Sequence, residues 1–316
     1  LFAVMHALKG KGVAIVYISH RMEEVFAHCD TITVMRDGYA ISSKPTRETN
    51  MEQVVRDMVG RSITEYYPGR TNEPGETGLE VKNFCQEGLF NNISFKLRKG
   101  EILGVAGLMG AGRTEIMRAL FGVDSCKHGE VYLHGKKVCI KKPEDAIKAG
   151  IGFITENRKS EGLILDFSIS RNIALPSVDT FAKRSVINAK NETAFSEALS
   201  KKLGVKTASI DLEAGALSGG NQQKVVIAKW IGMNPSIIIM DEPTRGIDVG
   251  AKRDIYDLMN ELTSQGVAII MVSSELPEVI GMSDRILVIH EGKIAGELDH
   301  EEATQEKIIT LATGGQ

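Results

Sequence analysis

A glycine-rich segment between an apolar run and an amphipathic run constrains this chain's fold more than any other feature. The segment is Gly107-Leu-Met-Gly-Ala-Gly-Arg-Thr114; the apolar run Glu101–Ala106 precedes it, and apolar residues with helical spacing follow it in 115–121. Strand, glycine loop and helix in this order nearly match the phosphate-binding pattern G-x-x-x-x-G-K-[ST]. Glycines let backbone N–H groups surround phosphate oxygens, and the helix N-terminus favours an anion. The candidate phosphate-binding residues are Gly107, Gly110, Ala111, Gly112, Arg113, Thr114 and Glu115. By itself this motif also permits a purely structural turn.

Two carboxylates follow a second apolar run. The run Ile237–Met240 predicts a strand buried on both faces, and Asp241 and Glu242 come directly after it. Ligands of open α/β sheets bind at the carboxyl ends of the strands. Asp241, together with the hydroxyl of Thr114, is a candidate to position Mg²⁺. Glu242 is a candidate general base that polarises an attacking water, with a solvated turn as the alternative.

A third motif, Leu217-Ser-Gly-Gly-Asn-Gln-Gln223, precedes apolar residues that have helical spacing up to Gly232. Its serine can cap the helix, and the two glycines leave backbone N–H groups open to an anion. We expect a second anion cradle, with a plain capped helix as the alternative. The candidate residues are Leu217, Ser218, Gly219, Gly220, Asn221 and Gln222.

The three motifs in this order resemble the nucleotide-binding domain of ABC transporter ATPases. Thr244-Arg-Gly-Ile-Asp248 resembles that family's D-loop, with Asp248 at its end, and Ser19-His20 resembles its switch histidine. Leu-Ser-Gly-Gly-Asn-Gln-Gln, followed by Pro-Thr-Arg-Gly-Ile-Asp-Val-Gly-Ala-Lys at 243–252, is most similar to the fused ATPases of bacterial monosaccharide importers of the ribose and galactose type. The resemblance covers essentially the whole chain.

The resemblance implies a fold. It is an α/β P-loop NTPase of ABC type, with a mostly parallel core sheet, an antiparallel β subdomain and a helical insert. We expect the core strands at Leu103–Ala106, Ile237–Met240 and Ala268–Val272. The antiparallel part is expected at 78–100 and in the hairpin Glu130–Val138, and the helical insert after residue 165.

The resemblance also implies a mechanism and partners. ATP and Mg²⁺ bind between two domains packed head to tail, so that each signature motif serves the other domain's nucleotide. Glu242 and His20 are the implied catalytic residues, and Glu156 stands in the metal site where glutamine is usual. The implied partners are transmembrane permease subunits and, through them, a sugar-binding protein. The implied location is peripheral, on the cytoplasmic face of the membrane.

An internal repeat predicts the domain organisation. Residues 12–38 match residues 266–292 at a constant offset of 254, with 11 of 27 positions identical. We therefore expect 1–60 to be the C-terminal remnant of a first ABC ATPase domain, 61–77 a linker, and 78–316 a complete second domain. Val13–Ile18 is the expected strand of the remnant, marginal because its sheet neighbours are missing.

Three departures from the family pattern predict a weak or non-hydrolytic site on the second domain. Arg113 replaces a lysine, Ser274 stands at the degenerate switch position matched by His20, and Glu156 replaces a glutamine. A non-hydrolytic, nucleotide-gated module whose signature completes the partner domain's site is therefore an alternative function. The adenine platform is also open: Phe84 and Phe90 are candidates, and both suit a hydrophobic core.

Composition and charge weaken a third reading, a soluble tandem ABC protein acting on ribosomes or DNA. The net charge is −3, the aromatic content is 5%, and the linker is short, so no nucleic-acid partner is expected. The apolar runs are shorter than the roughly 18 residues that a membrane helix needs. The four cysteines are widely spaced, which favours reduced thiols.

Overall fold

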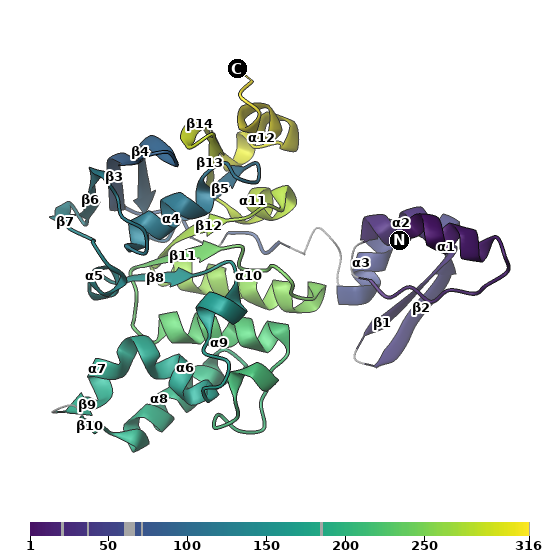
Figure 1. Ribbon diagram of the computed structural model, residues 1–316, viewed down its shortest axis with the longest axis horizontal. Helices are drawn as coiled ribbons and strands as arrows, with labels where there is room; N and C mark the ends of the chain where they lie inside the picture. Colours follow the sequence, from purple (N-terminus) through teal and green to yellow (C-terminus); the bar gives the residue numbers. More distant parts are fainter. Residues whose placement is uncertain (20–21, 37, 60–66, 71, 184–185, 316) are drawn as a thin grey trace. The chain divides into compact units, whose positions relative to one another are not determined.

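The computed structural model describes residues 1–19, 22–36, 38–59, 67–70, 72–183 and 186–315 (Figure 1). The chain divides into two compact units, Leu1–Tyr67 with Asp248–Asp254, and Pro68–Ile247 with Ile255–Gln316. None of the helices described is both long and apolar enough to cross a bilayer. The predicted boundaries at 60/61 and 77/78 stay a prediction, and residues 61–66 and 71 lie outside the described chain.

A six-stranded sheet forms the core of the second unit. Its spatial order is β14-β13-β5-β12-β11-β8, and every neighbouring pair is parallel except β13 with β14. The inner strands read as continuous apolar runs because both faces of the sheet are covered. This confirms the predicted parallel core. The strands are β5 (Ile102–Gly107), β8 (Ile151–Ile154), β11 (Ile237–Asp241), β12 (Ala268–Val272), β13 (Arg285–His290) and β14 (Lys293–Asp299).

Helices pack against this sheet at several strands. The helix α4 contacts β5, β8 and β11, while α11 contacts β5, and α12 contacts β5 and β13. The buried side chains of α4 include Ile116, Met117 and Leu120, which are among the residues with predicted helical spacing. The helices are α4 (Arg113–Phe121), α5 (Pro143–Lys148), α10 (Val249–Ser264), α11 (Leu276–Met282) and α12 (Gln305–Ala312).

The predicted antiparallel part is a separate four-stranded sheet of order β4-β3-β6-β7. Apolar and polar residues alternate along β4, as expected for a strand with one buried face. The strands are β3 (Thr77–Gln86), β4 (Phe90–Arg98), β6 (His128–Leu133) and β7 (Lys136–Val138).

The predicted helical insert is also present, and Figure 1 shows its helices gathered beyond β8. Within it α6 contacts both α8 and α9, and α9 returns the chain to β8. The buried Trp230 of α9 packs its ring edge-on against Phe121 of α4, so this tryptophan belongs to the core. The elements are α6 (Ile169–Ala174), α7 (Val178–Phe181), β9 (Ala182–Lys183), β10 (Val186–Ile187), α8 (Ala189–Lys202) and α9 (Gly219–Ile231).

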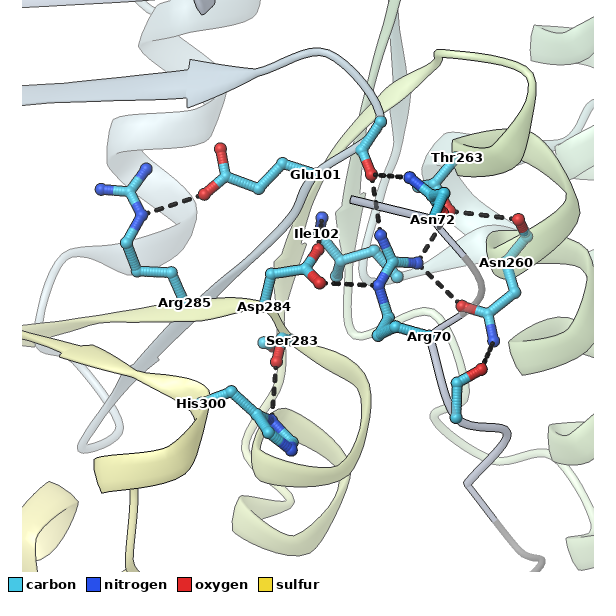
Figure 2. A network of polar contacts seen from close by, with 12 residues as sticks. Arg70, Asn72, Glu101, Ile102, Asn260, Thr263, Ser283, Asp284, Arg285 and His300 are labelled. Carbon is cyan, nitrogen blue, oxygen red and sulfur yellow. Dashed lines mark hydrogen bonds and ion pairs between the residues drawn. The ribbon is translucent and has the colours of Figure 1, made fainter. Parts of the chain in front are cut away.

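Within the second unit, Arg70 fixes the segment before β3 to the core (Figure 2). Its guanidinium donates to Asp284 Oδ1 at 2.8 Å, to Asn260 Oδ1 at 2.8 Å and to Thr263 Oγ1 at 2.7 Å. The Asn260 amide in turn donates to the carbonyls of residues 68 and 69, both at 3.1 Å. Residues 68–70 are therefore fixed to the core by mostly buried polar contacts.

The first unit contains helices and a two-stranded antiparallel sheet around four buried apolar residues, Val25, Ile32, Val34 and Val54. Its elements are α1 (Phe2–Lys9), α2 (Met22–His28), β1 (Thr31–Arg36), β2 (Tyr39–Pro45) and α3 (Met51–Val59). The predicted strand Val13–Ile18 is wrong, because this segment is not in a strand and its valines and isoleucines are exposed. None of the described strands pairs with it, and an extended segment without a neighbouring strand has no ladder of hydrogen bonds.

Candidate functional site

The phosphate-loop segment leaves the carboxyl end of β5, next to the centre of the sheet. Gly107 has φ +152°, and a Cβ there would lie 2.4 Å from the carbonyl oxygen of Ile289. Gly112, with φ +100°, occupies the N-cap of α4 and provides no side-chain cap. The first N–H groups of the helix are therefore open to an anion. Met109, 98% exposed, lies at the solvent-facing tip of the loop.

Asp241, the last residue of β11, is 1% exposed. Neither of its carboxylate oxygens has a well-formed hydrogen bond with any described residue. Burial raises the pKa of Asp241 to about 6, and the nearby Thr114 hydroxyl and Arg113 guanidinium offset part of that rise. A buried carboxylate without a partner beside a threonine hydroxyl fits a hard divalent cation.

Glu242 follows in the left-handed region, with φ +49°. Burial raises the pKa of Glu242 to about 7, while the Ser274 hydroxyl and Arg113 lower it in part. The Ser274 hydroxyl donates to Glu242 Oε2 at 3.0 Å. A carboxylate that titrates near neutral pH suits a general base.

Arg113 points back toward these carboxylates and the end of β12. Its Nη1 donates to the carbonyl oxygen of Ser273 at 2.8 Å, and its Nη2 lies 3.9 Å from Glu242 Oε1. The guanidinium is mostly buried in this position. Arg113 occupies the lysine position of the phosphate-binding pattern, and its guanidinium therefore already contacts other groups of the protein.

The sequence did not single out Glu278, which organises the same corner from α11. This buried carboxylate accepts hydrogen bonds from Thr244 Oγ1 at 2.7 Å and from the hydroxyl of Ser273. The contacts hold the loop after β11 to the end of β12. Only the repeat gave a signal for it, since Glu278 matches Glu24 at the offset of 254.

The signature segment leads into α9 as predicted, with Ser218 at the N-cap. The predicted side-chain cap is absent, because the Ser218 hydroxyl accepts from Asn221 Nδ2 at 3.0 Å instead of from the helix backbone. Gln222 is buried and donates to the carbonyl of Ala214 at 3.3 Å. The N-terminal N–H groups of α9, including Gly219 and Gly220, thus remain available to an anion, next to the partly buried Leu217.

The remaining candidates lie apart from the carboxylate pair or outside the described residues. The carboxylate of the half-exposed Glu156 forms an ion pair with Arg245, so its role as a metal ligand stays a prediction. Asp248 accepts from the Ala251 N–H at 3.0 Å near the start of α10. His20 lies outside the residues that the structure describes. Nowhere in the described chain do three or more His, Cys, Asp or Glu side chains form a metal cluster.

The two phenylalanine candidates for the adenine platform are both buried, and their rings stack on each other at 5.5 Å. The turn between them lies beside the phosphate loop, because a Cβ on Gly112 would be 3.4 Å from the carbonyl oxygen of Leu89. A cavity of about 400 Å³ is lined by residues 85–91 of this turn together with Lys127 and Glu291. The stacked faces of Phe84 and Phe90 are turned to each other, so an adenine platform here stays a prediction.

Comparisons with known proteins decide the family. The ABC transporter family profile matches residues 90–245. The ribose import ATP-binding proteins of Oceanobacillus iheyensis and Bacillus subtilis (strain 168) are 62% and 61% identical to this chain. Residues 90–245 of the chain therefore form a domain of the ABC transporter family. Both alignments cover 100% of this chain and 64% of the relative, so the chain spans less than two thirds of these curated relatives.

Solved ABC cassettes share the fold of this chain. A crystal structure of an ATP-binding cassette in its ADP conformation superposes with a TM-score of 0.64 at 23% identity, over 75% of this chain and 99% of that one. A dimeric cassette bound to ADP and phosphate gives 0.60 at 22% identity, over 70% and 98%. The predicted α/β fold of ABC type, with its parallel core and antiparallel subdomain, is confirmed.

Proposed function

We propose that this chain contributes to the ATP-binding, ATP-hydrolysing subunit of a bacterial ABC importer for ribose or a related monosaccharide. The observation that carries the proposal is the meeting of an open helix N-terminus after β5 with Asp241 and Glu242 at the end of β11, both at the carboxyl edge of one parallel sheet. The two curated relatives, aligned over the whole chain, support ribose as the substrate class.

The nucleotide would bind with its phosphates on residues 107–115. Thr114 and Asp241 would hold Mg²⁺ together with phosphate oxygens and water, because both Asp241 oxygens need a partner. When bound, the metal would supply positive charge to offset the charge that develops on the phosphates. Glu242 would hold the attacking water and take its proton, and the Ser274 hydroxyl fixes the direction of its carboxylate.

The chain's partners follow from this function. Residues 1–60 and 78–316 belong, in this proposal, to two ATPase cassettes joined by 61–77 and packed head to tail. His20 would serve the site completed by the signature residues 217–222, and Asp248 would face the partner cassette. Permease subunits and a sugar-binding protein would complete the importer, with the ATPase peripheral on the cytoplasmic face of the membrane.

A second candidate, a nucleotide-gated module with little hydrolysis, is favoured by the position of Arg113. Its guanidinium binds the Ser273 carbonyl and lies beside Glu242, so it is withdrawn from a phosphate and it stabilises the ionised general base in place. A planar fork also replaces the compact ammonium of lysine. Both effects reduce stabilisation of a transferring phosphoryl group.

MgATP affinity and turnover measured on one sample test both candidates. We expect binding that requires Mg²⁺ and is weakened by Thr114→Ala, with slow turnover. The paired changes Arg113→Lys and Ser274→His should raise turnover about tenfold or more. Fast turnover by the unchanged chain, abolished by Glu242→Gln, would exclude the gated module, whereas absence of binding would overturn the nucleotide site.

A further inference from the structure

The geometry points to Arg158 as a positioning residue that holds the Arg245–Gly246 turn against the signature residue Gly219. It begins a one-turn π-helix, Arg158–Gly162, that connects the phosphate-loop helix, the signature helix and the loop carrying Glu242. This inference rests on the proposed function, because the parts that it joins are those assigned to the nucleotide.

Arg158 spans two successive carbonyl groups with one guanidinium. Its Nη1 donates to the carbonyl oxygen of Arg245 at 2.7 Å and its Nη2 to that of Gly246 at 3.2 Å. Gly246 has φ +66°, which turns the chain so that both carbonyls face the same fork. A planar guanidinium suits two adjacent acceptors, and a lysine ammonium offers no such fixed fork.

The same guanidinium fills the space beside the signature glycine. A Cβ on Gly219 would lie 2.7 Å from Arg158 Nη2 and 3.4 Å from the carbonyl oxygen of Gly246. The first residue of α9 is therefore packed directly against the fork and the turn that the fork holds. Moving Arg158 would release both.

The turn after β11 also carries Glu242. The Arg245 N–H donates to the carbonyl oxygen of Glu242 at 3.1 Å, so the residues from 242 to 245 form one closed turn. The carboxylate of Glu156 adds an ion pair to the Arg245 side chain. Holding the carbonyl of Arg245 thus limits how far the general base can move.

The other end of the π-helix is anchored on two helices. The buried Lys229 of α9 donates its Nζ to the carbonyl oxygen of Gly162 at 2.6 Å, and a Cβ on Gly162 would lie 3.2 Å from Val226 of α9. Glu161 lies 3.8 Å from Arg118 Nη1 on α4. One short turn therefore touches the helices of both anion-binding motifs and the general-base loop.

Amide hydrogen exchange of the full chain without nucleotide tests the inference. Arg158→Met should raise exchange about tenfold in residues 243–247 and 219–222, because both segments lose the fork. Arg158→Lys should recover only part of the protection. Arg171→Met is the matched control, since Arg171 is an exposed arginine of the same subdomain whose side chain only lies over the Phe167 ring; it should leave both segments unchanged.

A double-mutant cycle separates positioning from a general loss of stability. Gly219→Ala should displace the guanidinium and raise exchange in 243–247 by itself, and adding Arg158→Met should raise it no further. MgATP affinity should stay within about threefold in Arg158→Met, because the phosphate loop is untouched, while single-turnover hydrolysis falls about tenfold.

The outcomes distinguish this inference from the proposed function. Unchanged exchange in Arg158→Met, or fully additive effects in the cycle, would overturn the positioning role even if the chain binds MgATP. Failure of the unchanged chain to bind MgATP would overturn the proposed function and leave the exchange result standing. Equal losses of affinity and turnover would also count against positioning.

Discussion

The two copies of the internal repeat fold alike over most of their length and differ at one strand. Counting 254 residues on from the first copy, α2 becomes α11, β1 becomes β13 and β2 becomes β14, each with the same bounds. The bulge after Val34 recurs after Val288. The four buried core residues of the first copy also recur, as Val279, Ile286, Val288 and Ile308.

The difference lies just before these shared elements. Ala268–Val272 is the fully buried β12, paired on one side with β11 and on the other with β5. Its counterpart 14–18 is not a strand, and Val16 and Ile18 are about nine-tenths exposed. Nearly the same residues therefore become a core strand or an exposed segment according to whether neighbouring strands are present.

The equivalent aspartates of the two copies, Asp30 and Asp284, form ion pairs with different cationic side chains. Asp30 pairs with Lys9 at 2.5 Å on an exposed surface. The position of Lys9 is Thr263 in the second copy, and there Arg70 supplies the positive charge to Asp284 and bonds the Thr263 hydroxyl as well (Figure 2). Asp30 of the first copy thus pairs with a lysine close to it in the sequence, whereas Asp284 of the second copy pairs with an arginine far from it in the sequence.

Removing one isoleucine from each copy should show the largest contrast. Ile15 and Ile269 are equivalent, but Ile269 is fully buried and Ile15 is 39% exposed. Ile269→Ala should lower the free energy of unfolding by about 2–5 kcal/mol, because it leaves a cavity in a packed sheet. Ile15→Ala should change it by less than about 0.5 kcal/mol. Urea unfolding followed by circular dichroism measures both, and equal losses would show that the exposed segment is packed in solution.

Removing the cation from each aspartate should show a smaller contrast. Arg70→Met should lower the free energy of unfolding by about 2–3 kcal/mol, since Asp284, Asn260 and Thr263 lose a mostly buried donor. Lys9→Met should cost about 0–1 kcal/mol, and raising the salt concentration should abolish that cost. A comparable loss in the two variants would mean that burial does not distinguish the pairs.

The smallest expected effect is a pH dependence of the free energy of unfolding. It arises at Glu242, which accepts a hydrogen bond from Ser274, the residue equivalent to His20 of the first copy. Because burial raises the pKa of Glu242 from 4.5 to about 7, the folded chain binds the proton more tightly than the unfolded chain. This contribution to stability is complete below pH 4.5 and is lost as the pH rises through 7. Glu242→Gln should therefore raise the free energy of unfolding by about 1–2 kcal/mol at pH 8 and change it little at pH 5.

Ser274→Ala sharpens the same measurement. The change removes the donor hydroxyl that lowers the pKa of Glu242. The pH midpoint of the Glu242 contribution should therefore move upward. Glu302→Gln, an exposed change on the 3₁₀ turn after β14, should leave the pH profile as it is.

Much of the site could be predicted from the sequence because its motifs act through the backbone. The glycines at 107 and 112 stand where a Cβ would clash or where φ is positive, so their place in the chain reports the local shape. Asp241 and Glu242 follow a short apolar run, and such a run predicts a buried strand. The order of residues along the chain was therefore enough to predict these site residues.

Arg158, Glu278 and Lys229 could not be found in this way. Each acts through a partner far along the sequence: Arg158 on residues 245 and 246, Glu278 on Thr244, and Lys229 on Gly162. Nothing in the periodicity of α9 marks Lys229 as buried, since a lysine is ordinarily solvated. The pairing exists only once the loops have been brought together.

The sequence by itself determined the order of the elements, the repeat, the glycine loops and the family resemblance. Only the tertiary structure decided which copy of the repeated apolar run becomes a strand, and that Arg113 turns to Glu242 and the Ser273 carbonyl. The reason is physical. Helical spacing, turns and glycine conformations are local, whereas a strand's hydrogen bonds and a buried charge's partner come from other parts of the chain.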